Sequence, residues 1–253
     1  MAERESMILT LAAEDEWRPP IPDISHIETE DDTPVDNLFS EKAMRLLADI
    51  LVNGWHGPAD GRAFVVMTNV GLFAGLRQPP LVPDLLLSLG VTYPEDIGTK
   101  EHRSYFIWEY GKPPDVVVEI VSNRKGDELS DKLLDYARIG ISYYVVHDPY
   151  HHLGQTTLRV FENTGGHFRE LTDFWLDTVG LGVTLWDGEY EGVHNRWLRW
   201  CERDGALIPT ASETIRQAED AIAAEHARAS AAEQRAEALA ARLRALGIDP
   251  DAA

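Results

Sequence analysis

The chain lacks the usual features of secreted and membrane proteins. It has a single cysteine, Cys201, so it can form neither an internal disulfide nor a cysteine zinc cluster. No apolar run approaches the roughly 18 residues of a membrane span. The first residues, Met-Ala-Glu-Arg-Glu-Ser, carry no apolar signal segment. We therefore expect a cytoplasmic protein with no membrane partner.

Basic residues are also scarce. The chain has 23 Lys and Arg against 43 Asp and Glu, which gives a formal net charge of -20. Such a protein has weak nonspecific affinity for nucleic acid, because that affinity comes from basic side chains that displace counterions. A local basic rim could still form around the buried strand discussed below, from Lys100, Arg103, Lys112, Arg124 and Lys125.

Composition divides the chain into four parts. Residues 1–36 combine acidic clusters with four prolines and show no lasting period, which indicates an extended or partly disordered arm. Residues 37–205 carry the patterns of one globular domain. Residues 206–247 are rich in Ala, Glu and Arg, and residues 248–253 form a short tail.

The domain shows helix and strand patterns in alternation. In chain order they are a helix from Ser40 to about Gly54, a strand or hairpin over 62–73, a strand beginning at Asp84, a buried strand over 116–121, a helix over 128–140, a strand over 141–147, and short strands over 158–162, 167–171 and 183–186, the last followed by a turn at Asp187–Gly188. A helix between two buried strands predicts a βαβ crossover and a parallel pair. Four tryptophans are interpreted as core and covering residues and not as ligand platforms: Trp175, Trp186, Trp197 and Trp200.

A buried charge marks the candidate site. Glu119 interrupts an apolar strand that should be buried on both faces, where an ionised carboxylate costs several kcal/mol unless a cation compensates it. Lys132 interrupts the apolar side of the next helix, between Leu129 and Tyr136. Two simpler interpretations stay open: Glu119 could be a structural ion-pair partner of Lys132 or could reach water at a strand end, and Lys132 could snorkel along its neighbours.

A second carboxylate can join Glu119. Asp84 and Asp115 both follow a proline, but Asp115 lies four residues before Glu119 on one strand, roughly 13 Å away at about 3.3 Å per residue. Asp84 lies on another strand, which can run alongside. Two carboxylates, a backbone carbonyl and waters would suit Mg²⁺ or Mn²⁺. Lys132 could then orient or deprotonate a water, or stabilise charge on a phosphate.

The Ala/Glu/Arg segment carries a heptad seam. Its members alternate spacings of three and four: Ile215, Ala218, Ile222, Glu225, Ala229, Ala232, Ala236, Leu239, Leu243 and Leu246. This pattern predicts a coiled coil and a homo-oligomer. Alanine buries little area and Glu225 is polar, so a solvated single helix is the alternative.

The run PPDVVVEIVSNRKGDELSDKLLDYARIGISYYVVHDP, residues 113–149, resembles the Uma-two family of restriction-endonuclease-like proteins in the PD-(D/E)XK nuclease superfamily. The likeness extends from about Asn37 to the predicted coiled coil. It implies Asp84 and Glu119 as metal ligands and catalytic residues, with Lys132 as a catalytic lysine moved from the strand to the helix. The usual superfamily position of that lysine is taken here by Val121.

We therefore expect an α/β restriction-endonuclease-like core, a mixed sheet flanked by helices, with extra strands and a C-terminal coiled coil. The expected function is an endonuclease that hydrolyses DNA with Mg²⁺ or Mn²⁺, as a homodimer. A noncatalytic scaffold with a nuclease fold is the alternative. A glycosidase is disfavoured, because its paired acids need no lysine.

Two further groups of residues are lesser candidates. Glu41, on the first helix, could be an extra acidic ligand, and whether Lys125 contributes to the site stays open. His147, His151 and His152 surround a strand-ending turn and could bind a transition metal, but nothing nearby in the sequence completes a tetrahedral set.

Overall fold

The computed structural model describes residues 37–122 and 128–247. Its elements are α1 (Leu38–Asp49), the π-helical turn η1 (Ile50–Gly54), β1 (Phe64–Thr68), β2 (Leu72–Phe73), β3 (Leu85–Leu89), the 3-10 turn η2 (Lys100–His102), β4 (Tyr105–Phe106), α2 (Ile107–Tyr110), β5 (Val116–Ile120), α3 (Asp131–Ile139), β6 (Tyr143–His147), β7 (Leu158–Asn163), β8 (Phe168–Glu170), β9 (Trp175–Leu176), β10 (Leu181–Tyr190), β11 (Val193–Cys201) and α4 (Ala211–Ala245). The predicted arm 1–36, the tail 248–253, and Arg124 and Lys125 lie outside the described residues.

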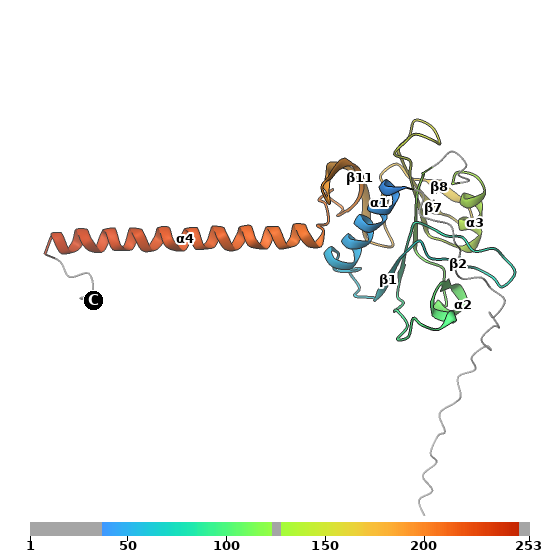
Figure 1. Cartoon of the computed structure of the whole chain (residues 1–253), viewed down its shortest axis with the longest axis horizontal. Coiled ribbons are helices and arrows are strands. Elements are labelled where there is room, and N and C mark those ends of the chain that lie inside the picture. Colours follow the sequence, from blue (N-terminus) through green and yellow to red (C-terminus); the bar gives the residue numbers. More distant parts are fainter. Residues whose placement is uncertain (1–36, 123–127, 248–253) are drawn as a thin grey trace, which may run out of the picture.

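A six-stranded mixed sheet forms the centre of the domain (Figure 1), in the order β1-β3-β5-β6-β7-β8. β5 and β6 are parallel and α3 connects them, as the βαβ pattern predicted. The other neighbouring pairs in this sheet are antiparallel. The predicted class, a mixed sheet flanked by helices, is confirmed.

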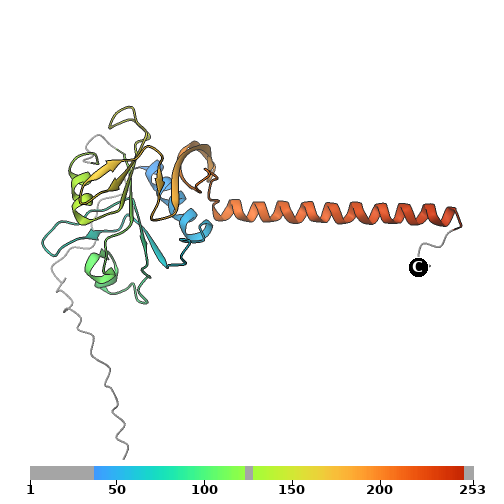
Figure 2. The ribbon, with the colours of Figure 1, turned by 180° about the vertical axis from the view of Figure 1, so that it is seen from behind.

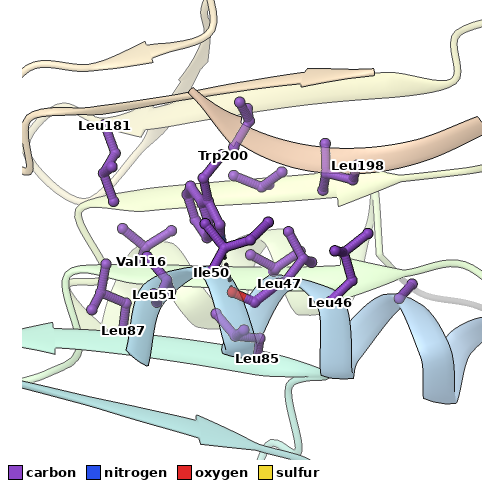
Figure 3. Packing of buried hydrophobic residues seen from close by; sticks show 14 of the residues in the cluster. Leu46, Leu47, Ile50, Leu51, Leu85, Leu87, Val116, Leu181, Leu198 and Trp200 are labelled. Carbon is purple, nitrogen blue, oxygen red and sulfur yellow. Dashed lines mark hydrogen bonds between the residues drawn. The ribbon is translucent and has the colours of Figure 1, made fainter. Parts of the chain in front are cut away.

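β5 is buried on both faces because a helix covers each one. Val116, Val118 and Ile120 pack in the core beneath α1, and the alternate residues Val117 and Val121 pack with α3. Figure 3 shows the α1 side, where leucines of α1 and η1 meet β3 and β5 and the Trp200 indole donates to the Leu47 carbonyl. Each such buried side chain contributes about 1.5–3 kcal/mol. The alternation leaves Glu119 on the α3 face.

The predicted segment 62–73 divides between two sheets, so neither a single strand nor a hairpin is correct. β1 pairs with β3 in the central sheet, whereas β2 pairs with β4 in a separate two-stranded parallel sheet. Between β1 and β2 the chain turns at Asn69, which has a φ of 53°. The Asn69 amide donates to the Asp84 carbonyl over 3.2 Å, so this turn supports the residue that precedes β3.

A three-stranded antiparallel sheet, in the order β11-β10-β9, adds the expected extra strands. The predicted turn at Asp187–Gly188 is wrong, because β10 continues through it and the turn falls at Glu191–Gly192, with φ of 46° and 76°. Gly188 is needed inside the strand. A Cβ atom there would stand 1.9 Å from the Trp186 ring. The Gly188 carbonyl also accepts a hydrogen bond of 3.1 Å from the Trp197 indole.

The predicted role of the tryptophans is confirmed in two forms. Trp197 and Trp200 are fully buried and belong to the core beneath α1. Trp175 and Trp186 are partly buried and carry arginine guanidinium groups on their ring faces, at 5.0 and 4.7 Å from the ring centroids. All four therefore act in packing.

α4 begins with a capping box, in which Thr210 and Glu213 satisfy each other's backbone amides. The buried Arg199 of β11 ties this end to the domain, because its guanidinium pairs with the Glu213 carboxylate at 2.8 Å. Beyond its first turns the helix projects away from the domain (Figures 1 and 2). Its predicted seam residues Ile215 and Ile222 are exposed. None of the helices described is long and apolar enough to cross a membrane.

Candidate metal centre at the end of the central strand

Glu119 lies at the carboxyl end of β5 and is only 4% exposed. One carboxylate oxygen, Oε2, is 2.9 Å from the Lys132 Nζ atom. The other, Oε1, accepts a hydrogen bond of 2.7 Å from the buried Tyr136 hydroxyl. The possibility that Glu119 reaches water at a strand end is therefore wrong. Its charge is compensated within the protein, by an ammonium and a hydroxyl from the same helix.

α3 supplies both partners because Lys132 and Tyr136 are one turn apart on the side of α3 that faces Glu119. Gly140, in the left-handed conformation with φ of 94°, ends the helix, as predicted. The Lys132 side chain remains 29% exposed although its amine contacts Glu119. The site thus opens toward solvent along this lysine.

Burial and pairing act in opposite directions on the two charged groups. Burial lowers the pKa of the Lys132 amine, but the Glu119 carboxylate outweighs it, and the net pKa is raised. Lys132 therefore stays an ammonium at neutral pH. Burial raises the pKa of the Glu119 carboxyl, and the Lys132 ammonium and Tyr136 hydroxyl oppose that rise. Burial prevails at Glu119, whose net pKa is raised, while Lys132 and Tyr136 limit that rise.

Asp84 lies next to Glu119. β3 runs antiparallel to β5 with Leu85 opposite Val118, and the next position in this register brings Asp84 opposite Glu119. The Asp84 carboxylate accepts a hydrogen bond from the Ile120 amide of β5. It also contributes to the raised pKa of Lys132, which puts its charge on the α3 side of the sheet. Asp84, Glu119 and Lys132, predicted from three separate segments, thus meet at one end of β5.

Glu128 is a fourth charged residue at this site, and the sequence analysis did not single it out. It is 8% exposed, just before α3. Its Oε1 atom is 3.5 Å from the Lys132 Nζ atom, and its backbone carbonyl accepts from the Tyr144 hydroxyl at 3.1 Å. The signal in the sequence was the spacing of four between Glu128 and Lys132, which would put the two on one side of the predicted helix over 128–140. In the structure α3 begins at Asp131, and Glu128 lies in the turn before it.

Other acidic candidates lie elsewhere. Glu41 pairs with Arg45 on α1, which covers the opposite face of the sheet from α3, so it cannot join the Glu119 site. Asp115 lies at the other end of β5, where it pairs with Lys112 and accepts from the Leu89 amide at 2.7 Å. Lys112 therefore compensates Asp115 and does not form part of a basic rim around Glu119.

The three histidines do not form a metal site. His147 ends β6 on the α1 side, fully buried against the Phe39 ring, with neither ring nitrogen hydrogen-bonded among the described residues. Burial lowers the pKa of this imidazole to about 4, although the nearby Asp148 carboxylate partly opposes the shift. The Asp148 carboxylate instead accepts backbone amides, including that of His152 at 2.9 Å. His147 is a neutral core residue.

The donors at the Glu119 site suit a hard divalent cation by type. Asp84, Glu119 and Glu128 offer only carboxylate oxygens, which Mg²⁺ and Mn²⁺ prefer. One buried oxygen, Oε2 of Glu128, has no hydrogen-bond partner in the described structure. Within residues 37–122 and 128–247, however, no three His, Cys, Asp or Glu side chains form a group that could hold a metal ion as they stand. The Lys132 ammonium lies between two of these acids.

A family model named Uma2, described as a putative restriction endonuclease, matches residues 18–175. That range includes Asp84, Glu119, Glu128 and Lys132. Among curated proteins and among solved structures, nothing matches the chain.

Proposed function

Because this chain belongs to the Uma2 family, we propose that it is a metal-dependent endonuclease that hydrolyses phosphodiester bonds in DNA. The proposed cofactor is Mg²⁺ or Mn²⁺, held by Asp84 and Glu119. The observation that carries the proposal is the compensated Glu119 carboxylate, 2.9 Å from an ammonium and beside a second carboxylate, at the end of a central strand. The single buried cysteine, Cys201, supports action in the reducing cytoplasm.

The chain's own residues would have distinct roles in this reaction. Asp84 and Glu119 would supply the carboxylate ligands, and Tyr136 would hold Glu119 in position through its hydroxyl. When bound, the cation would polarise a phosphoryl oxygen and acidify a water.

Lys132 would act as an ammonium. The neighbouring carboxylates raise its pKa, which favours stabilising negative charge on the phosphate or orienting a water over removing a proton. Its partial exposure lets it meet a substrate that approaches from solvent. This role is electrostatic, so it depends on the charge at Lys132.

A cleavage assay tests the proposal. Supercoiled plasmid and single-stranded DNA would be incubated with the full-length protein in Mg²⁺ or Mn²⁺, and with EDTA. We expect nicking that EDTA and Glu119→Gln abolish. Asp115→Asn, at the far end of the same strand, is the matched control and should cleave as the wild type does.

The rival function is a noncatalytic scaffold that keeps the fold and assembles through α4. Failure of the wild type to cut any DNA tested would favour it.

We further propose that α4 pairs with α4 of a second copy. Four large apolar residues of the seam are 59–75% exposed and otherwise have no cover in the described chain: Ile215, Ile222, Leu239 and Leu246. In a parallel pair, Arg228 at heptad position g of one helix would lie near Glu233 at position e of the other helix. Opposite charges at these two positions form the salt bridges between helices that are typical of coiled coils. The polar seam residue Glu225 lies 3.6 Å from Arg228 of its own helix, which offsets its charge.

A further inference from the structure

Glu128 carries a buried carboxylate that is only half compensated. Its Oε1 atom is 3.5 Å from the Lys132 ammonium, beyond a strong hydrogen bond. Its Oε2 atom is buried and has no hydrogen-bond partner in the described structure. A buried carboxylate oxygen without a partner is costly, and native proteins supply a donor or a cation for most such atoms.

One ammonium serves more negative charge than it can neutralise. Lys132 Nζ is 2.9 Å from Glu119 Oε2 and 3.5 Å from Glu128 Oε1, and the Asp84 carboxylate also acts on it. Among the described residues, the buried carboxylates of Glu119 and Glu128 therefore share one ammonium at the end of β5, and the charge of Asp84 acts on the same ammonium. A divalent cation would neutralise two of those charges.

We propose that the Lys132 ammonium occupies the place of a divalent cation, and that Glu128 is a third oxygen ligand once the cation has displaced it. This inference rests on the proposed metal-dependent function. Lysine suits such an exchange, because its ammonium is a compact charge on a flexible stem. Part of the Lys132 side chain is already exposed, which gives the ammonium a path toward solvent. Withdrawn from the acids, the ammonium would face an approaching phosphate.

Mn²⁺ binding to the full-length protein without DNA tests this exchange, by electron paramagnetic resonance of free Mn²⁺ and by calorimetry. Glu128→Gln should weaken binding at least tenfold, because it removes a charged ligand. Lys132→Met should strengthen binding, because it removes the competing ammonium. Lys132→Gln should do the same, and it keeps a donor toward Glu119 in case the Met variant fails to fold. Asp135→Asn, exposed on the same helix, should leave affinity unchanged.

The outcomes separate the two claims. No Mn²⁺ binding by the wild type would overturn the metal-dependent function and this inference together. Binding that Asp84→Ala abolishes, but that Glu128→Gln leaves unchanged, would overturn only the role of Glu128. Weaker or equal binding in both Lys132 variants would overturn the exchange while leaving the proposed function standing.

Discussion

Replacing Lys132 by Met should destabilise the protein, because the buried Glu119 carboxylate is then left without its counter-charge. Glu119 is 4% exposed and Lys132 supplies its only full positive charge among the contacts described. Methionine is unbranched, matches the apolar stem of lysine as far as Cε and lacks only the terminal Nζ, so the packing along α3 changes little. The variant therefore isolates the ammonium.

The magnitude follows from the geometry. At 2.9 Å and an effective dielectric constant of about 20, the attraction between the two charges is about 6 kcal/mol before desolvation is subtracted. Loss of one partner from a buried pair costs about 3–5 kcal/mol. Lys132 is partly exposed and the Tyr136 hydrogen bond remains, so we expect about 3 kcal/mol at pH 7.

The loss should shrink at acidic pH. Without the ammonium, burial raises the pKa of Glu119 unopposed by its main counter-charge. When the folded-state pKa of a carboxyl lies above its unfolded value, near 4.5 here, its full contribution to the stability of the folded protein is present below that unfolded pKa. This contribution is lost as the pH rises through the folded-state pKa. Urea unfolding at pH 5 and pH 7 should therefore show a smaller deficit at pH 5.

Two variants complete the measurement. Lys112→Met removes a similarly exposed lysine from the Asp115 pair at the other end of the strand and should cost less than half as much, because Asp115 is less buried and keeps the Leu89 amide. The double variant Glu119→Leu with Lys132→Met should recover most of the lost stability. A deficit under 1 kcal/mol for Lys132→Met at pH 7, or no recovery in the double variant, would refute the reasoning.

Three further predictions concern other parts of the molecule. The wild-type protein should lose about 2 kcal/mol of stability between pH 7 and pH 5, because the buried His147 imidazole has a pKa of about 4 and unfolding lets it take up a proton below about pH 6.5. His147→Met should remove this loss. Urea unfolding at both pH values checks it, and exposed His194→Met should keep the wild-type dependence. Tyr136→Phe should cost about 2 kcal/mol at pH 7, because the buried Glu119 carboxylate loses a hydrogen bond; equal unfolding midpoints would count against it. By light scattering, the full-length protein should have about twice the chain mass of 28.3 kDa, and a variant without residues 219–253 should be a monomer. An unchanged number of subunits would exclude pairing through α4.

The main elements of the fold could be predicted because their patterns are local. The apolar run over 116–121, the amphipathic helix after it and the strand over 141–147 predicted the parallel pair that the structure contains. The Asp187–Gly188 turn failed because pairing with β11 carries β10 straight through it, with Asp187 opposite Arg196, and Gly188 makes room for the neighbouring Trp186 ring. The sheet formed by β2 and β4 joins residues more than thirty positions apart and has no local pattern.

The site was partly predictable for a similar reason. Glu119 and Lys132 stand out because each breaks an apolar pattern, and the structure pairs them at 2.9 Å. Glu128 breaks no such pattern, since an acid at the start of a helix is ordinary. Its burial arises from tertiary contacts, among them the Tyr144 hydroxyl from β6. Which carboxylates share one lysine is therefore a property of the folded chain.

The most direct test of metal-dependent catalysis is the single-turnover rate of cleavage of a labelled DNA duplex as a function of Mn²⁺ concentration, for the wild type and Asp84→Ala. Asp84 lies beside Glu119 but makes no ion pair with Lys132 in the structure, so its loss removes a proposed ligand and leaves the Glu119 pair in place. We predict a rate that saturates with Mn²⁺ in the wild type and is lost in the variant. Cleavage that persists in EDTA, or that Asp84→Ala leaves unchanged, would contradict a metal-dependent nuclease.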